Sequence, residues 1–307
     1  IGQEALETNT TGASNVAIGF RALEANSTGS NNTAIGDEAL KANTDTDNNV
    51  AVGRRALNQN TTGANNTAVG TYAGYSITTG NNLTAMGYQA AYANVGGENC
   101  AFGSEALEAN TTGASNTALG FRALEDNTTG GSNVAIGRDA LEASNASYNN
   151  AIGAYALTAT TTGSSNEALG YAALKANTTG SFNIAIGREA LADNTTASNN
   201  LAIGYQALYV ATTAPNNVAL GNYNLTANTT GDNNTAVGYG VMQANTTGAN
   251  NTAVGKGALV ANTTASYNTA VGYQALDAVT TGGGNVALGV DTLGALTTGT
   301  ENIAIGN

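Results

Sequence analysis

The stretch Asn251-Thr252-Ala253-Val254-Gly255 carries the pattern that decides the fold. Its centre, an alanine followed by an apolar residue and a glycine, returns along the whole chain from residues 17–19 to residues 304–306. The glycines of this triplet define 18 intervals, of which 16 are 17 residues long and two are 16. Helical solenoid repeats need about 33 residues or more. The spacing therefore predicts one coil of a parallel β-solenoid per repeat.

Each coil is expected to hold two short strands and two turns. The first strand is the stretch quoted above, and the second has the pattern Ala-Leu-x-Ala-Asn, as at residues 173–177. Alternation along a strand places Thr252 and Val254 on one face and Ala253 on the other. Which face is inward stays open. If Val254 faces inward, a strip of small residues lies outside; if Ala253 faces inward, the column of apolar triplet residues lies outside. The leucines of the second segment, from Leu6 to Leu293, are expected to fill the interior.

The connecting segments have turn chemistry. Asn-Thr-Thr-Gly, as at residues 110–113, combines side chains that bond their own backbone with a glycine that tolerates positive φ. Three alanines replace this glycine, so positive φ is expected to be preferred there rather than required: Ala197, Ala214 and Ala265. The Asn that precedes each first strand is expected to form a stacked amide ladder, which only Leu83 interrupts.

These patterns predict an all-β protein in which residues 1–307 form a single continuous solenoid domain. The sequence starts and stops inside a repeat, so it is interpreted as a fragment of a longer chain. No stretch of 18 apolar residues is present, and no membrane insertion is expected within this segment.

Composition argues against several functions. The chain has no His, which removes the imidazole base and metal ligand, and it has no phosphate-binding loop or paired-acid motif. We therefore expect no enzyme, no catalytic residues, no cofactor and no metal. The turn at residues 45–49 has a D-x-D-x-N spacing but lacks the glycine and glutamate of a calcium loop. A net charge of −12 argues against a nucleic-acid partner.

Aromatic residues that follow the triplet glycine are the candidate surface contacts. They are Phe20, Tyr88, Phe121, Tyr171, Tyr205, Tyr239 and Tyr273. Exposed aromatic faces suit glycan or protein contacts. The alternative is that these rings clamp neighbouring coils or the next chain.

The strand motif Asn-Thr-Ala-Val-Gly, at residues 66–70, 234–238, 251–255 and 268–272, resembles the Asn-Ser-Val-Ala-Ile-Gly repeat of YadA-type trimeric autotransporter adhesin heads. The stretch at residues 268–276 is similar to repeats of tail-fibre-like proteins of phages and bacteria. The resemblance implies a left-handed β-roll, a homotrimer, and surface attachment through an unknown host receptor or glycan. The adhesin repeat is a few residues shorter, and no neck, stalk or anchor is present in this sequence.

The expected function is that of a structural fibre segment, an adhesin head or tail-fibre shaft, at a cell surface or on a virion. Whichever strand face is outward, it forms a low-charge strip that seldom stays exposed to solvent. A homotrimer would cover this strip. The alternative is a monomer on which the strip stays exposed. A self-assembling extracellular filament or surface-layer element is a second hypothesis. An ice-binding solenoid is a third hypothesis. The Thr-Thr pairs argue against it, because they are expected to lie in turns and not on one flat face.

Overall fold

A computed structural model describes residues Ile1–Asn307 and shows one three-residue strand in each coil and no helix. The strands are β1 (Val16–Ile18), β2 (Thr33–Ile35), β3 (Val50–Val52), β4 (Thr67–Val69), β5 (Thr84–Met86), β6 (Cys100–Phe102), β7 (Thr117–Leu119), β8 (Val134–Ile136), β9 (Asn150–Ile152), β10 (Glu167–Leu169), β11 (Ile184–Ile186), β12 (Leu201–Ile203), β13 (Val218–Leu220), β14 (Thr235–Val237), β15 (Thr252–Val254), β16 (Thr269–Val271), β17 (Val286–Leu288) and β18 (Ile303–Ile305).

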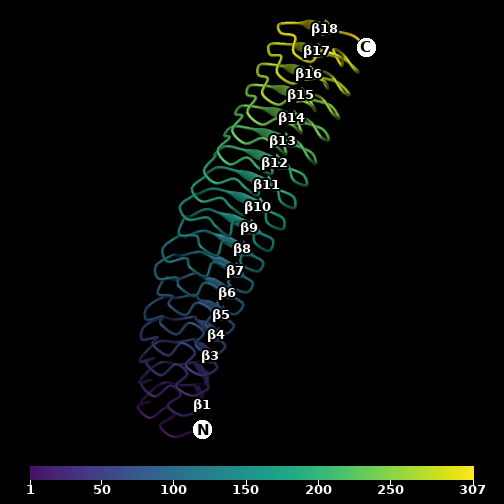
Figure 1. Cartoon of the computed structure of the whole chain (residues 1–307). Helices are drawn as coiled ribbons and strands as arrows, with labels where there is room; N and C mark the ends of the chain where they lie inside the picture. Colours follow the sequence, from purple (N-terminus) through teal and green to yellow (C-terminus); the bar gives the residue numbers. More distant parts are fainter. The chain divides into compact units, whose positions relative to one another are not determined.

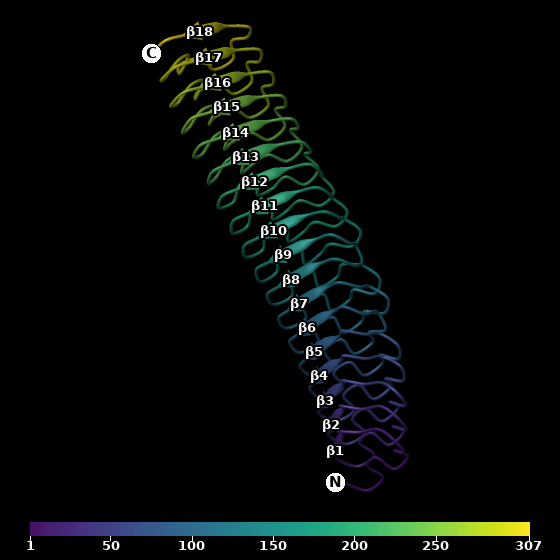
Figure 2. The same cartoon turned by 180° about the vertical axis from the view of Figure 1, so that it is seen from behind.

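The chain comprises two compact units. Unit 1 is Ile1–Asn149 with β1 to β8, and unit 2 is Asn150–Asn307 with β9 to β18. Within each unit, consecutive strands lie side by side in chain order (Figures 1 and 2). They pair in parallel and in register, so that Ala17 lies opposite Ala34 in unit 1 and Ala270 opposite Ala287 in unit 2. The predicted all-β parallel β-solenoid with 17-residue coils is confirmed.

The strands direct their central alanine inward. Ala253 is fully buried, whereas Thr252 and Val254 on either side of it face outward. This alternation is repeated along both units and settles the orientation that the sequence left open. The interior is filled by alanine, leucine and asparagine, and the aliphatic residue of each triplet lies on the outer face of the sheet.

The predicted second strand is wrong. The Ala-Leu-x-Ala-Asn segment and the residue before it form consecutive tight turns; in the first coil Arg21, which precedes the segment, and Leu23, within it, have φ of 54° and 53°. Its amides alternate between two kinds of acceptor: Leu23 N–H donates to the Ala39 carbonyl of the next coil, and Ala22 N–H donates to Gly19 within its own coil. Ala22 and Leu23 are both fully buried, whereas consecutive residues of a strand point to opposite faces, as in the strands of this sheet, where one face is outward.

The glycine of the triplet is required by close contact between coils. Gly187 has a φ of 130°, and a Cβ at this position would lie 2.5 Å from the Gly204 carbonyl oxygen. The glycine of the Asn-Thr-Thr-Gly turn differs from the expectation, because Gly113 is not in the positive-φ region. Positive φ falls two residues later, at Ser115. Alanine at this position therefore needs no left-handed backbone, although a Cβ on Gly113 would overlap the Gly130 carbonyl oxygen and the coils must shift to hold it.

The predicted asparagine column before the strands is buried, but its bonds run mainly to the backbone. Asn49 donates its backbone N–H to Asn32 Oδ1 over 2.9 Å, and its Nδ2 donates to the Gly63 carbonyl over 3.0 Å. Leu83 has no amide, yet its N–H still donates to Asn66 Oδ1 over 2.8 Å. The column thus satisfies the polar groups of one corner of each coil.

A second asparagine column, at the end of the Ala-Leu segment, forms the amide-to-amide ladder. Asn26 Nδ2 donates to Asn9 Oδ1, and Asn43 Nδ2 donates to Asn26 Oδ1, both over 2.9 Å. The same amide donates to the carbonyl three residues later, as from Asn26 to Gly29 over 3.0 Å. This ladder was not predicted, because the pattern Ala-Leu-x-Ala-Asn was interpreted as a strand.

Candidate functional site

The predicted aromatic contacts all lie at the corner that follows the strand-ending glycine. Six of them expose 40–51% of their surface and Tyr205 is half-buried. The exposed six are Phe20, Tyr88, Phe121, Tyr171, Tyr239 and Tyr273. Their placement on the surface agrees with the sequence-based expectation, and what they bind stays a prediction.

Several of these rings also contact neighbouring coils. The Arg188 guanidinium carbon lies 5.6 Å from the Tyr171 ring centroid and 5.9 Å from that of Tyr205. Tyr223 meets Tyr205 and Tyr239 edge to face, with centroid separations of 5.2 and 5.7 Å. Part of the ring surface of Tyr171, Tyr205 and Tyr239 therefore packs between coils, as the clamping interpretation requires, and part remains exposed.

A tyrosine cluster in unit 1 was not predicted. Tyr75 and Tyr92 are stacked with centroids 5.1 Å apart, and Tyr72 meets them edge to face. Tyr75 and Tyr92 occupy the same coil position in adjacent repeats. Aligning the repeats by position would have revealed them, because identical side chains in one column stack.

The corner of unit 2 is hollowed between two of the predicted aromatics. The hollow has a volume of about 270 Å³. Its lining is Tyr239, Gly240, Gln243, Lys256, Gly257, Val260, Tyr273 and Gln274. It brings together two aromatic faces, one cation and two amides, which is the composition of a small-ligand site.

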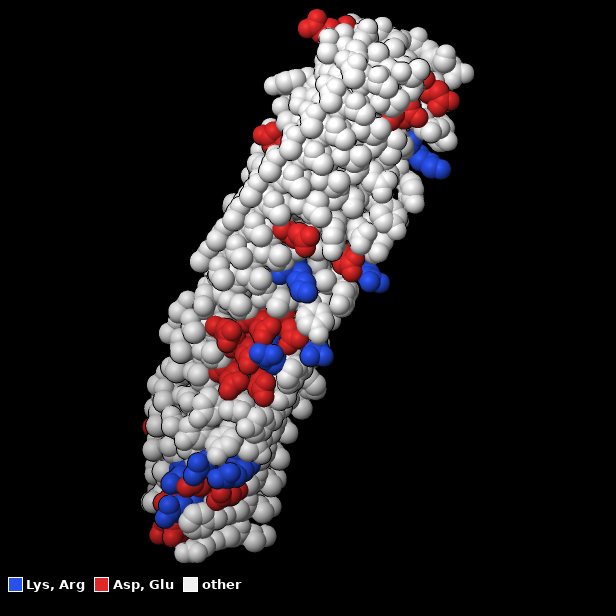
Figure 3. Space-filling view, viewed as in Figure 1, with Lys and Arg blue, Asp and Glu red and all other residues white.

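Unit 1 carries a mixed-charge patch near the N-terminal end (Figure 3). Glu38 lies 2.7 Å from Arg55 Nε and 3.2 Å from Lys41 Nζ. Burial raises the pKa of Glu38, but the hydrogen bonds from Lys41 and Arg55 outweigh it and leave the pKa below its ordinary value. The opposite charges are paired with one another, so this patch offers few free charges to a ligand.

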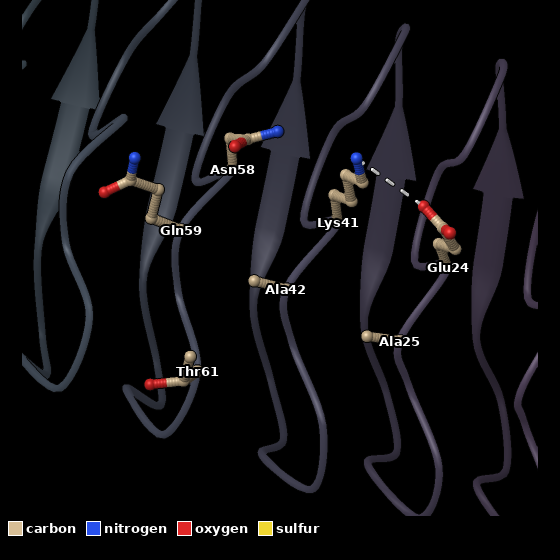
Figure 4. A pocket seen from close by; sticks show the side chains of 7 residues that line it. All are labelled: Glu24, Ala25, Lys41, Ala42, Asn58, Gln59 and Thr61. Carbon is tan, nitrogen blue, oxygen red and sulfur yellow. Dashed lines mark ion pairs between the residues drawn. The ribbon is translucent and has the colours of Figure 1, made fainter.

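An open groove of about 440 Å³ crosses the same patch (Figure 4). Its lining is Glu24, Ala25, Lys41, Ala42, Asn58, Gln59 and Thr61. Lys41 points toward Glu24, with 3.8 Å between Nζ and Oε2. Because Lys41 is also bonded to Glu38, the only cation of the groove is neutralised from both sides.

A second patch is mostly acidic (Figure 3). Burial, with the charges of Glu105, Glu125 and Asp126, raises the pKa of Glu108. Burial also raises the pKa of Glu125, although Arg122 opposes the shift. Carboxylate oxygens of Glu105, Glu108 and Glu125 lie within 4.8 Å of one another. These half-exposed carboxylates repel one another, and nothing further in the structure points to a cation there.

The first threonine of the turns is bonded to the backbone. Thr246 Oγ1 donates to the Thr263 carbonyl over 3.0 Å, and Thr263 Oγ1 donates to Thr280 over 3.1 Å. These pairs lie in bends, as predicted. The calcium-like stretch at residues 45–49 also lies outside the strands, where Asp47 Oδ1 accepts the Ser30 N–H over 2.6 Å.

Comparison with known proteins leaves the resemblance to adhesin heads and tail fibres as a prediction. No protein-family model matches the chain, and no curated protein matches it either. The structure contains no helix of the length and apolar character that a membrane crossing requires.

Proposed function

We propose that this chain is a structural fibre segment, an adhesin head or tail-fibre shaft, that assembles as a homotrimer and attaches to a host cell or other surface. One observation carries the proposal: the apolar residue between the alanine and the glycine of every triplet lies on the outer face of the sheet, and none is buried. Examples are Ile18, Leu119, Leu169 and Leu288, which expose 40–49% of their surface.

This outer face is almost without charge. Glu167 is the only charged residue in the strands, and the Asn150 amide donates to both of its carboxylate oxygens over 2.8 and 2.9 Å. Soluble monomers rarely expose apolar patches larger than a few hundred Å². A repeating, in-register column of aliphatic side chains is self-complementary, so copies of the same chain are the occupants that fit it best.

The rest of the surface supports attachment rather than chemistry. The aromatic corner lies outside the strands, beyond the strand-ending glycine, and six of its seven rings are exposed. In the proposed assembly it stays accessible when sheet faces pack together. Weak contacts repeated along a unit and across chains would add through avidity. An extracellular or virion-surface location follows from this function.

Mass in solution tests the assembly. We expect light scattering to give a concentration-independent mass near three chains of 30.4 kDa. Ile203→Lys places a charge in the apolar column and should release monomers, whereas Tyr205→Lys at the corner should leave the mass unchanged. A wild-type monomer would contradict the trimer and direct the next measurement to thermal hysteresis. Growth of mass without limit would favour the filament instead.

Attachment is tested separately, with fluorescently labelled chain sedimented with animal and bacterial cells. We expect saturable binding by the wild-type chain and weaker binding by the Ile203→Lys monomer, because avidity is lost. Absence of binding to every cell type would contradict the attachment role while leaving the assembly result intact.

A further inference from the structure

The hollow in the corner of unit 2 exists because the repeat is broken there. The position after the aromatic column is glycine in two successive coils, Gly240 and Gly257. The other coils of unit 2 carry a side chain at this position: Tyr155, Ala172, Glu189, Gln206, Tyr223, Gln274 and Asp291. Two side chains are therefore missing in adjacent coils, and their absence opens the space.

Neither backbone nor packing requires these two glycines. Their φ values of 62° and 69° are close to those of Gln206 and Gln274, at 51° and 50° in the equivalent position. A Cβ on Gly257 would meet only Gln274 Cγ at 3.4 Å, and one on Gly240 only Gln243 Oε1 at 3.6 Å. Both are ordinary contacts. The glycines thus provide space rather than conformational freedom.

Two tyrosines form the walls of the hollow. Tyr239 and Tyr273 are separated by two coils, or about 10 Å in a parallel stack, and each exposes about half of its surface. The floor between them is held by backbone bonds, from Gly257 N–H to Tyr239 and from Gln274 N–H to Lys256, each 3.0 Å long. These bonds fix the backbone positions from which Tyr239, Lys256 and Tyr273 project in one column, and the exposed tyrosine rings offer apolar faces to a ligand ring.

Lys256 supplies the charge. Its Nζ lies 6.0 Å from the Tyr273 ring centroid and forms no ion pair within the chain. The Gln243 side chain lines the same space and forms no hydrogen bond within the chain. A cation without a carboxylate partner favours an anionic group on the ligand, and the amide suits hydroxyl groups.

We infer that this hollow binds a sugar residue that carries a single carboxylate, such as a sialic acid or a hexuronic acid. The tyrosine faces contact the apolar side of the ring, Lys256 pairs with the carboxylate, and Gln243 bonds a hydroxyl. The inference deepens the proposed attachment function and rests on it. Because the chain has a net charge of −12, one anionic residue at a chain end suits this surface better than a long polyanion.

The test uses saturation-transfer NMR on the full chain with 3′-sialyllactose, trigalacturonate and neutral lactose. We expect at least one carboxylated sugar to bind, and lactose to bind about tenfold more weakly or not at all. Gly257→Gln fills the hollow and should abolish binding. Asp291→Gln places the same side chain at the same coil position outside the hollow and should leave binding unchanged. Lys256→Gln should reduce the preference for the carboxylated sugar over lactose about tenfold.

Three results would overturn the inference. These are equal binding of lactose, binding that survives Gly257→Gln in a variant with an unchanged circular dichroism spectrum, and no binding of either acidic sugar. If Gly257→Gln does not fold, Lys256→Gln alone tests the inference: loss of the preference for the carboxylated sugar over lactose supports it, and an unchanged preference contradicts it. If the chain still binds cells although the hollow binds no sugar, the sugar site is wrong and the attachment function is retained.

Discussion

At the scale of single residues, the buried amides of the second asparagine column depend on the coil that follows. Asn60, Asn127 and Asn194 each have an Oδ1 without a hydrogen-bond donor. In the next coil the column holds Ile77, Ser144 or Ala211, none of which carries an amide that reaches back. An unsatisfied buried acceptor is costly, so these three breaks are weak points of the core.

Ala211→Asn should repair one of these breaks. The new Nδ2 would donate to Asn194 Oδ1, as Asn194 itself donates to Asn177 over 2.8 Å, and the new Oδ1 would face the amide of Asn228. We expect unfolding in urea to require about 1 kcal/mol more free energy. Asn194→Ala is the opposite change, because it removes the amide from a filled part of the column, and should be destabilising. A repaired column that is less stable than the wild type would show that the alanine site lacks room.

The acidic patch predicts a pH dependence. The raised pKa of Glu108 means that the folded chain holds this proton more tightly than the unfolded chain, so stability falls as pH rises through the folded pKa. Glu108→Gln should therefore raise the melting temperature at pH 7 and leave it unchanged at pH 4, where the wild-type carboxyl is mostly protonated. Glu98→Gln, outside the patch, is the control. Equal effects of Glu108→Gln at both pH values would argue against burial and neighbouring charge, acting through the raised pKa of Glu108, as the cause.

At the scale of the coil, the two glycines of a repeat have different physical roles. Gly187 is held at positive φ against the carbonyl of the next coil, whereas Gly180 ends an Asn-Thr-Thr-Gly turn at ordinary φ. Gly187→Ala should cost about 3 kcal/mol or more, because strain and overlap combine. A Cβ on Gly180 would also overlap a carbonyl oxygen of the next coil, that of Ala197, so the two sites differ in φ and not in contact. Gly180→Ala should cost less, since no left-handed strain is added and Ala197 shows that the neighbouring coil accommodates a methyl group at this position. Urea denaturation followed by circular dichroism compares the two, and equal losses would contradict the distinction.

Periodicity was enough to predict the coil but not the path of the backbone within it. The 17-residue spacing located every strand, because identical residues recur wherever coils stack in register. The Ala-Leu segment was assigned to a strand because left-handed backbone is rare for residues such as Leu23, with φ of 53°. No local pattern shows that an inter-coil bond from Leu23 and an intra-coil bond from Ala22 will share that segment.

The candidate site was predictable in part for a related reason. Tyr239 and Tyr273 stand out as aromatics after a glycine, and the structure places both on the surface. The hollow between them depends on what is missing at Gly240 and Gly257, which a search for chemical groups passes over. Comparing each repeat position with its counterparts detects such gaps.

At the scale of the whole molecule, the thin core accounts for the exposed aliphatic column. The interior of a coil is filled by small residues and leucine, so the larger triplet residues are left on the outer sheet face. Cys100 lies on that face at the start of β6, and it is half-buried and free. As the only cysteine of the chain, it reports on whether copies meet there.

In a homotrimer whose sheet faces pack around a common axis, the Cys100 thiols of different chains approach one another. A short bifunctional maleimide should then join chains in pairs, giving a dimer band on a denaturing gel. The control is Cys100→Ser with Ser104→Cys, which moves the thiol past Gly103 to the aromatic corner and away from the axis. We expect little cross-linking in that variant. Equal cross-linking from both positions, or labelled but unlinked Cys100 in the wild type, would show that the apolar face is not the interface and would favour assembly through another surface.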